Sequence, residues 1–248
     1  MTAIHSDEQY YSRRFLFGFA DCDCEKRASL YSVMQLLSEI AGEDYERRGL
    51  GYSTLMENGQ AFLLSGMCLN FFRVPHFLES GEATTWERCV SGPCFYRDFE
   101  IRGRDNSLLL AGNSRWLLVS PETREILRPA SLYGGLREGA PRQADCPQGA
   151  RLRRLESAQL LGERPIYYSD LDANGHVNNA VYGKIAVDFL PERLRMKNLQ
   201  RFDISFVRET RADERLKLWG GQTEKGYEIN GLAQDNLHFA CRFCFEEA

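Results

Sequence analysis

Hydrophobic positions recur at helical spacing in two parts of the chain. Residues 29–48 (SLYSVMQLLSEIAGEDYERR) carry apolar side chains every three or four positions: Leu30, Val33, Met34, Leu37, Ile40 and Ala41. Ser29 is a suitable N-cap and Gly49 a stop signal, so this pattern predicts a long amphipathic helix. A second helix is predicted over 179–190, before Pro191, with larger apolar residues on one side: Val181, Tyr182, Ile185 and Phe189.

Most of the remaining chain has the two-residue alternation and the turn residues that predict β-strands. The clearest of these are 61–74, 94–103, 107–120, 201–208 and 237–246. In the last segment Cys241 shares a face with three phenylalanines, whereas Cys244 falls on the other face. The CRFC motif is therefore expected to fill a sheet rather than to bind a metal ion, and the cysteines are expected to be reduced thiols.

An internal repeat divides the chain into two similar parts. Shifted by 149 residues, 19–40 aligns with 168–189 without a gap. Near the end of each part, 99–120 also resembles 227–248. Each part reads as a strand, a long helix and several antiparallel strands. The periodicity fails between 129 and 163, where Pro, Gly and Arg are frequent. We therefore predict an N-terminal half (1–130), a linker (131–162) and a C-terminal half (163–248), each half with a sheet curled around its helix and the two sheets joined at an edge.

Charge and composition narrow the possible functions. The chain has 248 residues, a formal net charge of −4 and a pI near 5.7. Nucleic-acid-binding proteins normally show a basic excess, so nucleic acid is not an expected partner. No apolar run is long enough to cross a bilayer, and the first residues lack the apolar core of a signal peptide. We expect a protein of the cytoplasm without stable membrane insertion.

The segment DLDANGHVNN (170–179) is the strongest candidate for chemistry. Asp172, Asn174 and His176 alternate, so in an extended segment they face the same way. Asn178 or Asn179 can cap the following helix, whose first amides could polarise a carbonyl or hold an oxyanion. The alternative is that these residues only cap the helix and close a tight turn, with a buried structural histidine.

The first half lacks this chemistry at the aligned positions, where Glu25, Arg27 and Ser29 replace the two asparagines and the histidine. Glu209 is a further candidate. The predicted helix runs ~18 Å away from the polar segment, and the strand ending in FVRET (206–210) returns about 26 Å. In the first half Val74 occupies the position of Glu209, which otherwise would be an ordinary surface glutamate.

Together, these segments resemble the acyl-ACP thioesterase family of plants and bacteria. The family motif is Asp-x-Asn-x-His-Val-Asn-Asn followed by a later Arg-Glu-Cys, and the likeness extends to GLGYSTLMENGQAFLL, YRDFEI and SRWLLVSPETREILRP in the first half. It covers nearly the whole chain. The resemblance implies an α+β tandem hot-dog fold, in which two long helices are each wrapped by antiparallel strands and the two sheets form one continuous sheet. It also implies hydrolysis of fatty acyl-ACP to fatty acid and ACP.

Carried over by position, the family's catalytic residues are Asp172, Asn174, His176 and Glu209. Glu209 would be the general base that activates water, with Asp172 orienting or assisting it. Asn174 would position the substrate carbonyl or the water, and His176 would hydrogen-bond within the cluster and help to protonate the leaving thiolate.

Two departures from the family pattern affect this assignment. Thr210 stands where the family has a cysteine, which excludes a cysteine nucleophile at that position. The family's Tyr-x-x-Trp-x-x-Glu is here Tyr182, Ile185 and Asp188. Substrate-binding residues are predicted at the start and on the apolar side of the second helix, where the alternative is an ordinary core: Asn178, Val181, Tyr182 and Ile185.

The resemblance also implies the partners. No metal or cofactor is expected, because the substrate itself carries the phosphopantetheine arm. The basic segments 151–154 and 192–197 are candidates for docking the acidic carrier protein, or are simply solvated surface. A homodimer is left open. The rival functions are an acyl-CoA thioesterase, a hot-dog dehydratase and a non-catalytic sensor that binds acyl thioesters.

Overall fold

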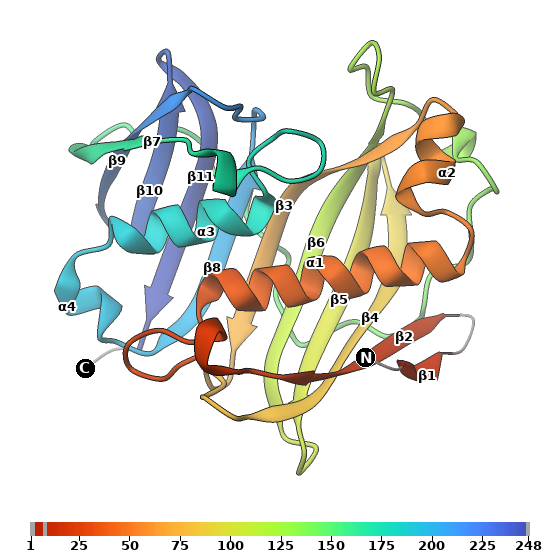
Figure 1. The fold of residues 1–248 in the computed structure, drawn as a ribbon, viewed down its shortest axis with the longest axis horizontal. Helices are drawn as coiled ribbons and strands as arrows, with labels where there is room; N and C mark the ends of the chain where they lie inside the picture. The colour runs from red at the N-terminus through yellow and green to blue at the C-terminus, as the bar shows by residue number, and fades with distance from the viewer. Residues whose placement is uncertain (1–2, 7–8, 247–248) are drawn as a thin grey trace.

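Two long helices lie against each other on one face of a curved antiparallel sheet (Figure 1). The computed structural model describes residues 3–6 and 9–246, so the outer ends of the two predicted halves lie outside the described residues. The helices are α1 (Leu30–Arg47), α2 (Tyr52–Glu57), α3 (Asn179–Asp188) and α4 (Glu192–Arg195). The strands are β1 (Ala3–Ser6), β2 (Tyr10–Leu16), β3 (Ala61–Phe71), β4 (Ser80–Ser91), β5 (Cys94–Gly103), β6 (Leu108–Val119), β7 (Gln159–Pro165), β8 (Leu199–Phe206), β9 (Arg215–Thr223), β10 (Gly226–Ala233) and β11 (Asn236–Phe245).

The two halves share one continuous sheet of 11 strands, in the order β1-β2-β4-β5-β6-β3-β8-β11-β10-β9-β7. The first half supplies β1 to β6 and the second half β7 to β11. They meet where β3 pairs antiparallel with β8, from Gly66 opposite Ser205 to Asn70 opposite Arg201. The predicted fold class, with two sheets joined edge to edge, is confirmed.

Both predicted long helices form where the periodicity places them. The Ser29 side chain accepts a hydrogen bond from the amide of Ser32 and so caps α1, and the whole predicted apolar stripe of this helix is buried. Asn178 caps α3 in the same way, through the amide of Ala180. α3 is shorter and is buried over most of its circumference, since it packs against α1 as well as the sheet.

A glycine allows the two helices to approach closely. A Cβ atom at Gly183 on α3 would lie 2.7 Å from Sδ of Met34 on α1, well inside van der Waals contact. The two helices therefore form one layer over the sheet, and one hydrophobic core runs through both halves.

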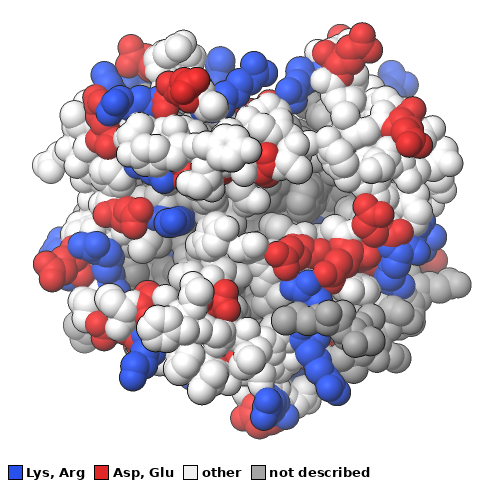
Figure 2. Space-filling model, viewed as in Figure 1, with Lys and Arg blue, Asp and Glu red and all other residues white. Residues whose placement is uncertain are grey.

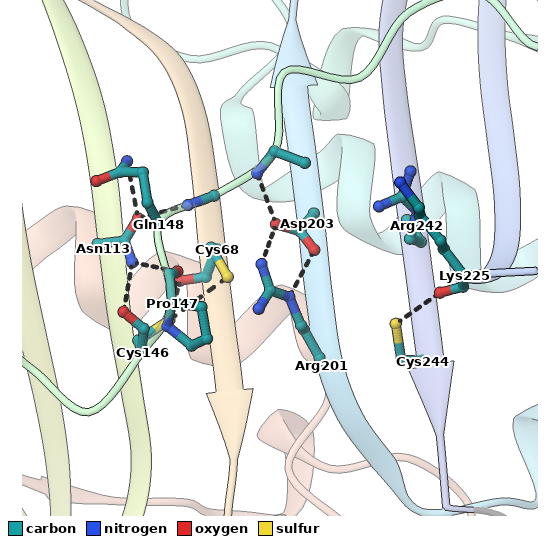
Figure 3. Close-up of polar contacts among 12 residues, drawn as sticks. Cys68, Asn113, Cys146, Pro147, Gln148, Arg201, Asp203, Lys225, Arg242 and Cys244 are labelled. Carbon is teal, nitrogen blue, oxygen red and sulfur yellow. Dashed lines mark hydrogen bonds and ion pairs between the residues drawn. The ribbon is translucent and has the colours of Figure 1, made fainter.

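The predicted linker crosses the face of the sheet opposite to the helices (Figure 3). Polar side chains of the strands hold its backbone there. Asn113 on β6 donates to the carbonyl of Pro147 at 2.9 Å, and Asp203 on β8 accepts from the amide of Ala150 at 3.1 Å. Asn230 on β10 accepts from the next part of the linker, the amide of Leu155, at 2.6 Å. These buried polar residues therefore satisfy the backbone of a segment that has no strand partners.

The linker ends earlier than predicted. β7 begins at Gln159, inside the range 131–162, and pairs only with β9 at the edge of the sheet. The sequence pattern did not predict this strand because it contains Gly162 and Pro165, which are rare in strands except at edges. In β11 the alternation is as predicted: Cys241 is in the core, whereas the Cys244 thiol lies on the opposite face and donates to the carbonyl of Lys225.

Candidate active site

Two short backbone contacts bring the polar segment 170–179 and the end of β8 together. His176 and Arg211 form an antiparallel β-bridge, and the amide of Val177 donates to the carbonyl of Thr210 at 2.9 Å. As a result, His176 Nε2 lies 3.3 Å from Glu209 Oε2. The structure thus joins the two distant segments as their spacing predicts.

Asp172 holds the loop that carries the histidine. One carboxylate oxygen, Oδ1, accepts hydrogen bonds from the amides of Asn174 and His176, at 2.8 and 3.4 Å. Asp23 makes the same bonds in the first half, to the amides two and four residues further on, both at 2.9 Å. This use of the aspartate is therefore part of the repeated scaffold rather than of the chemistry.

The rest of the loop follows the same 149-residue correspondence. Gly175 has a φ of +73°, and Lys26 at the aligned position has a φ of +60°, so both loops make the same left-handed turn. Asn178 and Ser29 are the aligned helix caps. Asp172 and Asn178 thus make backbone hydrogen bonds equivalent to those of their counterparts in the first half, whereas the side chains of Asn174, His176 and Glu209 have no chemical equivalent there.

Glu209 is held between the two halves. Its Oε2 faces His176, and its Oε1 accepts from Arg124 Nη1 at 2.8 Å. Arg124 belongs to the first half, in the turn after β6, and has a left-handed φ of +64°, which is unusual for a side chain of this size. Sequence reasoning missed this arginine, because nothing in its local pattern relates it to a glutamate 85 positions later.

These residues line a cleft of about 850 Å³, within the usual range for small-molecule sites. Asn174, Asn179 and Glu214 add further polar groups to its lining. The apolar wall comes mainly from the first half and the end of β8: Phe62, Leu63, Leu64, Leu117, Val119, Ile126, Phe206 and Val207. Figure 2 shows the surface hollowed between α3 and α2, above this part of the sheet.

Only one of the four predicted substrate-binding residues lines the cleft. Tyr182 lines the cleft. Val181 and Ile185 are buried in the core and are not among the residues that line the cleft, and Asn178 is engaged as the helix cap. α3 therefore supplies little of the apolar wall, because β3 and β6 of the other half take that place. No periodicity could identify those residues as cleft rather than core.

Comparison with known proteins agrees with this geometry. The N-terminal domain of acyl-ACP thioesterases matches residues 8–131, and the C-terminal domain of the same enzymes matches residues 156–238. The chain belongs to the acyl-ACP thioesterase family. It is therefore a thioester hydrolase. No curated protein sequence matches this chain.

Solved structures of acyl-ACP thioesterases have the same fold. An acyl-ACP thioesterase from Bacteroides thetaiotaomicron is 21% identical, with a TM-score of 0.79, over 96% of this chain and 98% of that one. The 12:0-ACP thioesterase from Umbellularia californica is 17% identical, with a TM-score of 0.83, over 98% of this chain and 99% of that one. Both likenesses extend over the tandem hot-dog as a whole.

In this thioesterase Thr210, at the family's cysteine position, is fully buried. Its Oγ1 accepts from the Tyr182 hydroxyl at 2.9 Å and lies 2.8 Å from His238 Nδ1 on β11. Burial lowers the pKa of His238 and raises the pKa of Tyr182 to about 12, so both side chains are neutral near pH 7. Sequence reasoning did not identify His238 as part of the site, since it reads as one more residue of a strand.

The buried hydrogen bonds among Tyr182, Thr210 and His238 support the floor of the cleft. The Tyr182 hydroxyl also accepts a hydrogen bond from the amide of Thr210 at 3.1 Å. We expect Tyr182→Phe to lower the free energy of unfolding by ~1–3 kcal/mol, since a buried amide loses its partner. Urea denaturation measures the change. Tyr168→Phe, at a 91% exposed position, should stay within about 0.5 kcal/mol of wild type. Equal midpoints for both variants would show that the Thr210 amide gains nothing from the tyrosine.

Residues 3–6 and 9–246 contain no cluster of His, Cys, Asp or Glu that could hold a metal ion. Within the same part of the chain, no helix has the length and hydropathy needed to span a membrane.

Proposed function

We propose that the protein hydrolyses fatty acyl-ACP to a free fatty acid and ACP, and that Glu209 activates the attacking water. The observation that carries the proposal is the 3.3 Å contact between Glu209 and His176 in a cleft that is lined by both polar and apolar side chains. A general base positioned in this way accelerates a reaction by about 100-fold or more.

Glu209 is the carboxylate best placed to act as the base. Arg124 binds one of its oxygens and fixes its orientation, while the other oxygen is directed to His176. Asp172, by contrast, uses Oδ1 to accept hydrogen bonds from the backbone amides of its own loop. We therefore assign Asp172 to holding the loop, and thereby His176, in place.

The start of α3 is the proposed oxyanion site. The Asn178 side chain accepts a hydrogen bond from the amide of Ala180, and the Asn178 carbonyl accepts one from the amide of Val181. The amide of Asn179 is left at the beginning of the helix, and both Asn179 and Asn174 line the cleft. One oxyanion donor contributes ~3 kcal/mol to transition-state stabilisation. When the tetrahedral intermediate collapses, His176 would pass a proton to the departing thiolate.

The first-half wall of the cleft is the proposed binding site for the acyl chain. Each buried methylene contributes roughly 0.8 kcal/mol, so the depth of this wall would set chain-length preference. The phosphopantetheine arm would enter past Arg208 and Arg211, two exposed arginines that line the cleft near Glu209. These are better placed to meet an acidic carrier protein than the segments 151–154 and 192–197, neither of which lines the cleft.

Hydrolysis of matched thioesters tests the substrate. We expect kcat/KM to be highest with dodecanoyl-ACP, lower with dodecanoyl-CoA, and we expect no dehydration of 3-hydroxydodecanoyl-ACP. Equal or greater efficiency with the CoA ester would favour the acyl-CoA thioesterase, and formation of an enoyl product would favour the dehydratase.

The arginines at the cleft predict a salt dependence that separates carrier docking from chemistry. Raising the salt concentration from about 50 to 500 mM shortens the Debye length from roughly 14 to 4 Å. The kcat/KM for acyl-ACP should then fall several-fold, whereas that for a small neutral thioester should change little. Arg208→Glu should lower kcat/KM for acyl-ACP at low salt. Arg193→Glu, on α4 and outside the cleft, is the matched control. An equal salt response for both substrates would argue against electrostatic docking.

A further inference from the structure

A second pocket lies at the opposite end of α3 from the catalytic cleft. Its volume is about 430 Å³, within the range of small-molecule sites. It is enclosed by the loop before α1, the end of α3, α4, and the ends of β3 and β11.

This pocket is the first half's counterpart of the catalytic cleft. Residues 22–31 contribute to it, and these align with 171–180 through the 149-residue shift. Val74 lies two positions before His76, which bridges Arg27, just as Glu209 lies two positions before Arg211, which bridges His176. The pocket therefore keeps the architecture of the cleft, with Val74 in place of the proposed base.

The floor of the pocket is apolar. Several hydrophobic side chains pack against the core on one side and remain partly exposed on the other: Tyr31, Val74, Val187, Leu199 and Phe245. An apolar ligand that covered this surface would be stabilised by removing apolar area from water. It is contributed by both halves, as is the wall of the catalytic cleft.

Basic side chains surround this floor. Arg27 is already occupied, because it pairs with Asp23 at 2.9 Å and donates to the carbonyls of Arg195 and Lys197. That leaves Lys184, Arg195 and Lys197 against one acid, Asp188, so the pocket carries a charge of 3 − 1 = +2 in a protein of net charge −4.

These cations are available to a ligand. Neither the Arg195 nor the Lys197 side chain forms a hydrogen bond or a close ion pair with another described residue. Lys184 lies 6.0 Å from the ring of Tyr31, and both Lys184 and Arg195 attract the Asp188 carboxylate without a close ion pair. Figure 2 shows acidic and basic side chains intermixed around α4 and the end of α3.

We propose that this pocket binds one free fatty acid, with the acyl chain on the apolar floor and the carboxylate among Lys184, Arg195 and Lys197. The basic residues of 192–197 thus serve a ligand site rather than the catalytic cleft. The choice of a fatty acid among anionic amphiphiles rests on the proposed function, since hydrolysis releases that molecule.

Isothermal titration calorimetry with dodecanoate below its micellar concentration tests the proposal, using two matched variants. Val74→Trp fills the second pocket, and Leu117→Trp fills the catalytic cleft. We expect Val74→Trp to bind one dodecanoate fewer than wild type and to keep kcat within about twofold. Leu117→Trp should keep the site that Val74→Trp loses. If Val74→Trp binds as many dodecanoate molecules per protein as wild type does, the proposal is overturned.

A charge reversal at Arg195, which is exposed, and Lys197, which is half-buried, tests the carboxylate contact without filling the core side of the pocket. The double variant Arg195→Glu, Lys197→Glu should weaken dodecanoate binding at this site about tenfold at low salt, and leave the binding of dodecanol unchanged. Equal weakening of the alcohol, or none of the acid, would rule out a carboxylate site. If wild type binds dodecanoate at this site but hydrolyses no acyl-ACP, the proposed function fails and the pocket stands.

Discussion

Glu209→Gln should lower kcat with acyl-ACP by at least about 100-fold, while KM and the stability of the fold change little. The amide keeps the shape of the side chain and can still contact Arg124 and His176 through its oxygen and nitrogen. It cannot accept a proton from water near neutral pH. The loss should therefore fall on the chemical step, which single-turnover hydrolysis measures directly.

Glu214→Gln is the matched control, because Glu214 also lines the cleft but contacts the amide of Arg211 rather than the histidine. We expect its kcat to remain within a few-fold of wild type. Turnover of Glu209→Gln near the wild-type value would show that another group activates the water. A large loss in both variants would indicate that the charge of the cleft, rather than a specific base, governs the rate.

Asp44→Ala should be the most destabilising of the substitutions considered, by about 3–5 kcal/mol in the free energy of unfolding. Asp44 on α1 is 1% exposed, and its carboxylate lies 2.8 Å from Arg97 Nη2 on β5, which is equally buried. Arg47 and Arg48 approach the same carboxylate at 2.7 and 3.1 Å. Without Asp44, a buried guanidinium at the junction of helix and sheet loses its closest counter-charge. Chemical denaturation measures the change.

An exposed ion pair provides the comparison. Arg73→Gln removes a pair with Glu79, in which the arginine side chain is 49% exposed. Pairs of this kind contribute ~0–1 kcal/mol, because water solvates both partners when the pair is broken. A loss in Asp44→Ala no greater than in Arg73→Gln would mean that Glu87, 4.0 Å from Arg97, or entering water already compensates the buried charge.

The site shows where sequence reasoning reaches its limit. The spacing of the polar segment and of FVRET predicted that His176 and Glu209 would meet, since both distances follow from regular helix and strand geometry. The roles of the individual residues in the polar segment could not be predicted as well from the sequence. The sequence suggests that Asp172 orients or assists the base, and only the equivalent hydrogen bonds of Asp23 identify its Oδ1 as part of the scaffold.

The sequence by itself determined the local elements of this protein and their duplication. The stripe of α1, the cap at Ser29 and the alternation in β11 depend on neighbours within a few residues, so their pattern is visible in the chain. For α3 the sequence left Asn178 and Asn179 as alternative caps, and the structure selects Asn178. The 149-residue repeat then showed which half carries the polar cluster.

Only the tertiary structure decided which distant side chains share one space. The pairing of β3 with β8 fixes how the halves meet, and with it the first-half wall of the cleft and the contact of Arg124 with Glu209. The tertiary structure alone also brings His238 to Thr210 and places the polar side chains of the sheet, such as Asp203, against the backbone of the linker. These contacts depend on strand register and chain crossing, which no local period encodes.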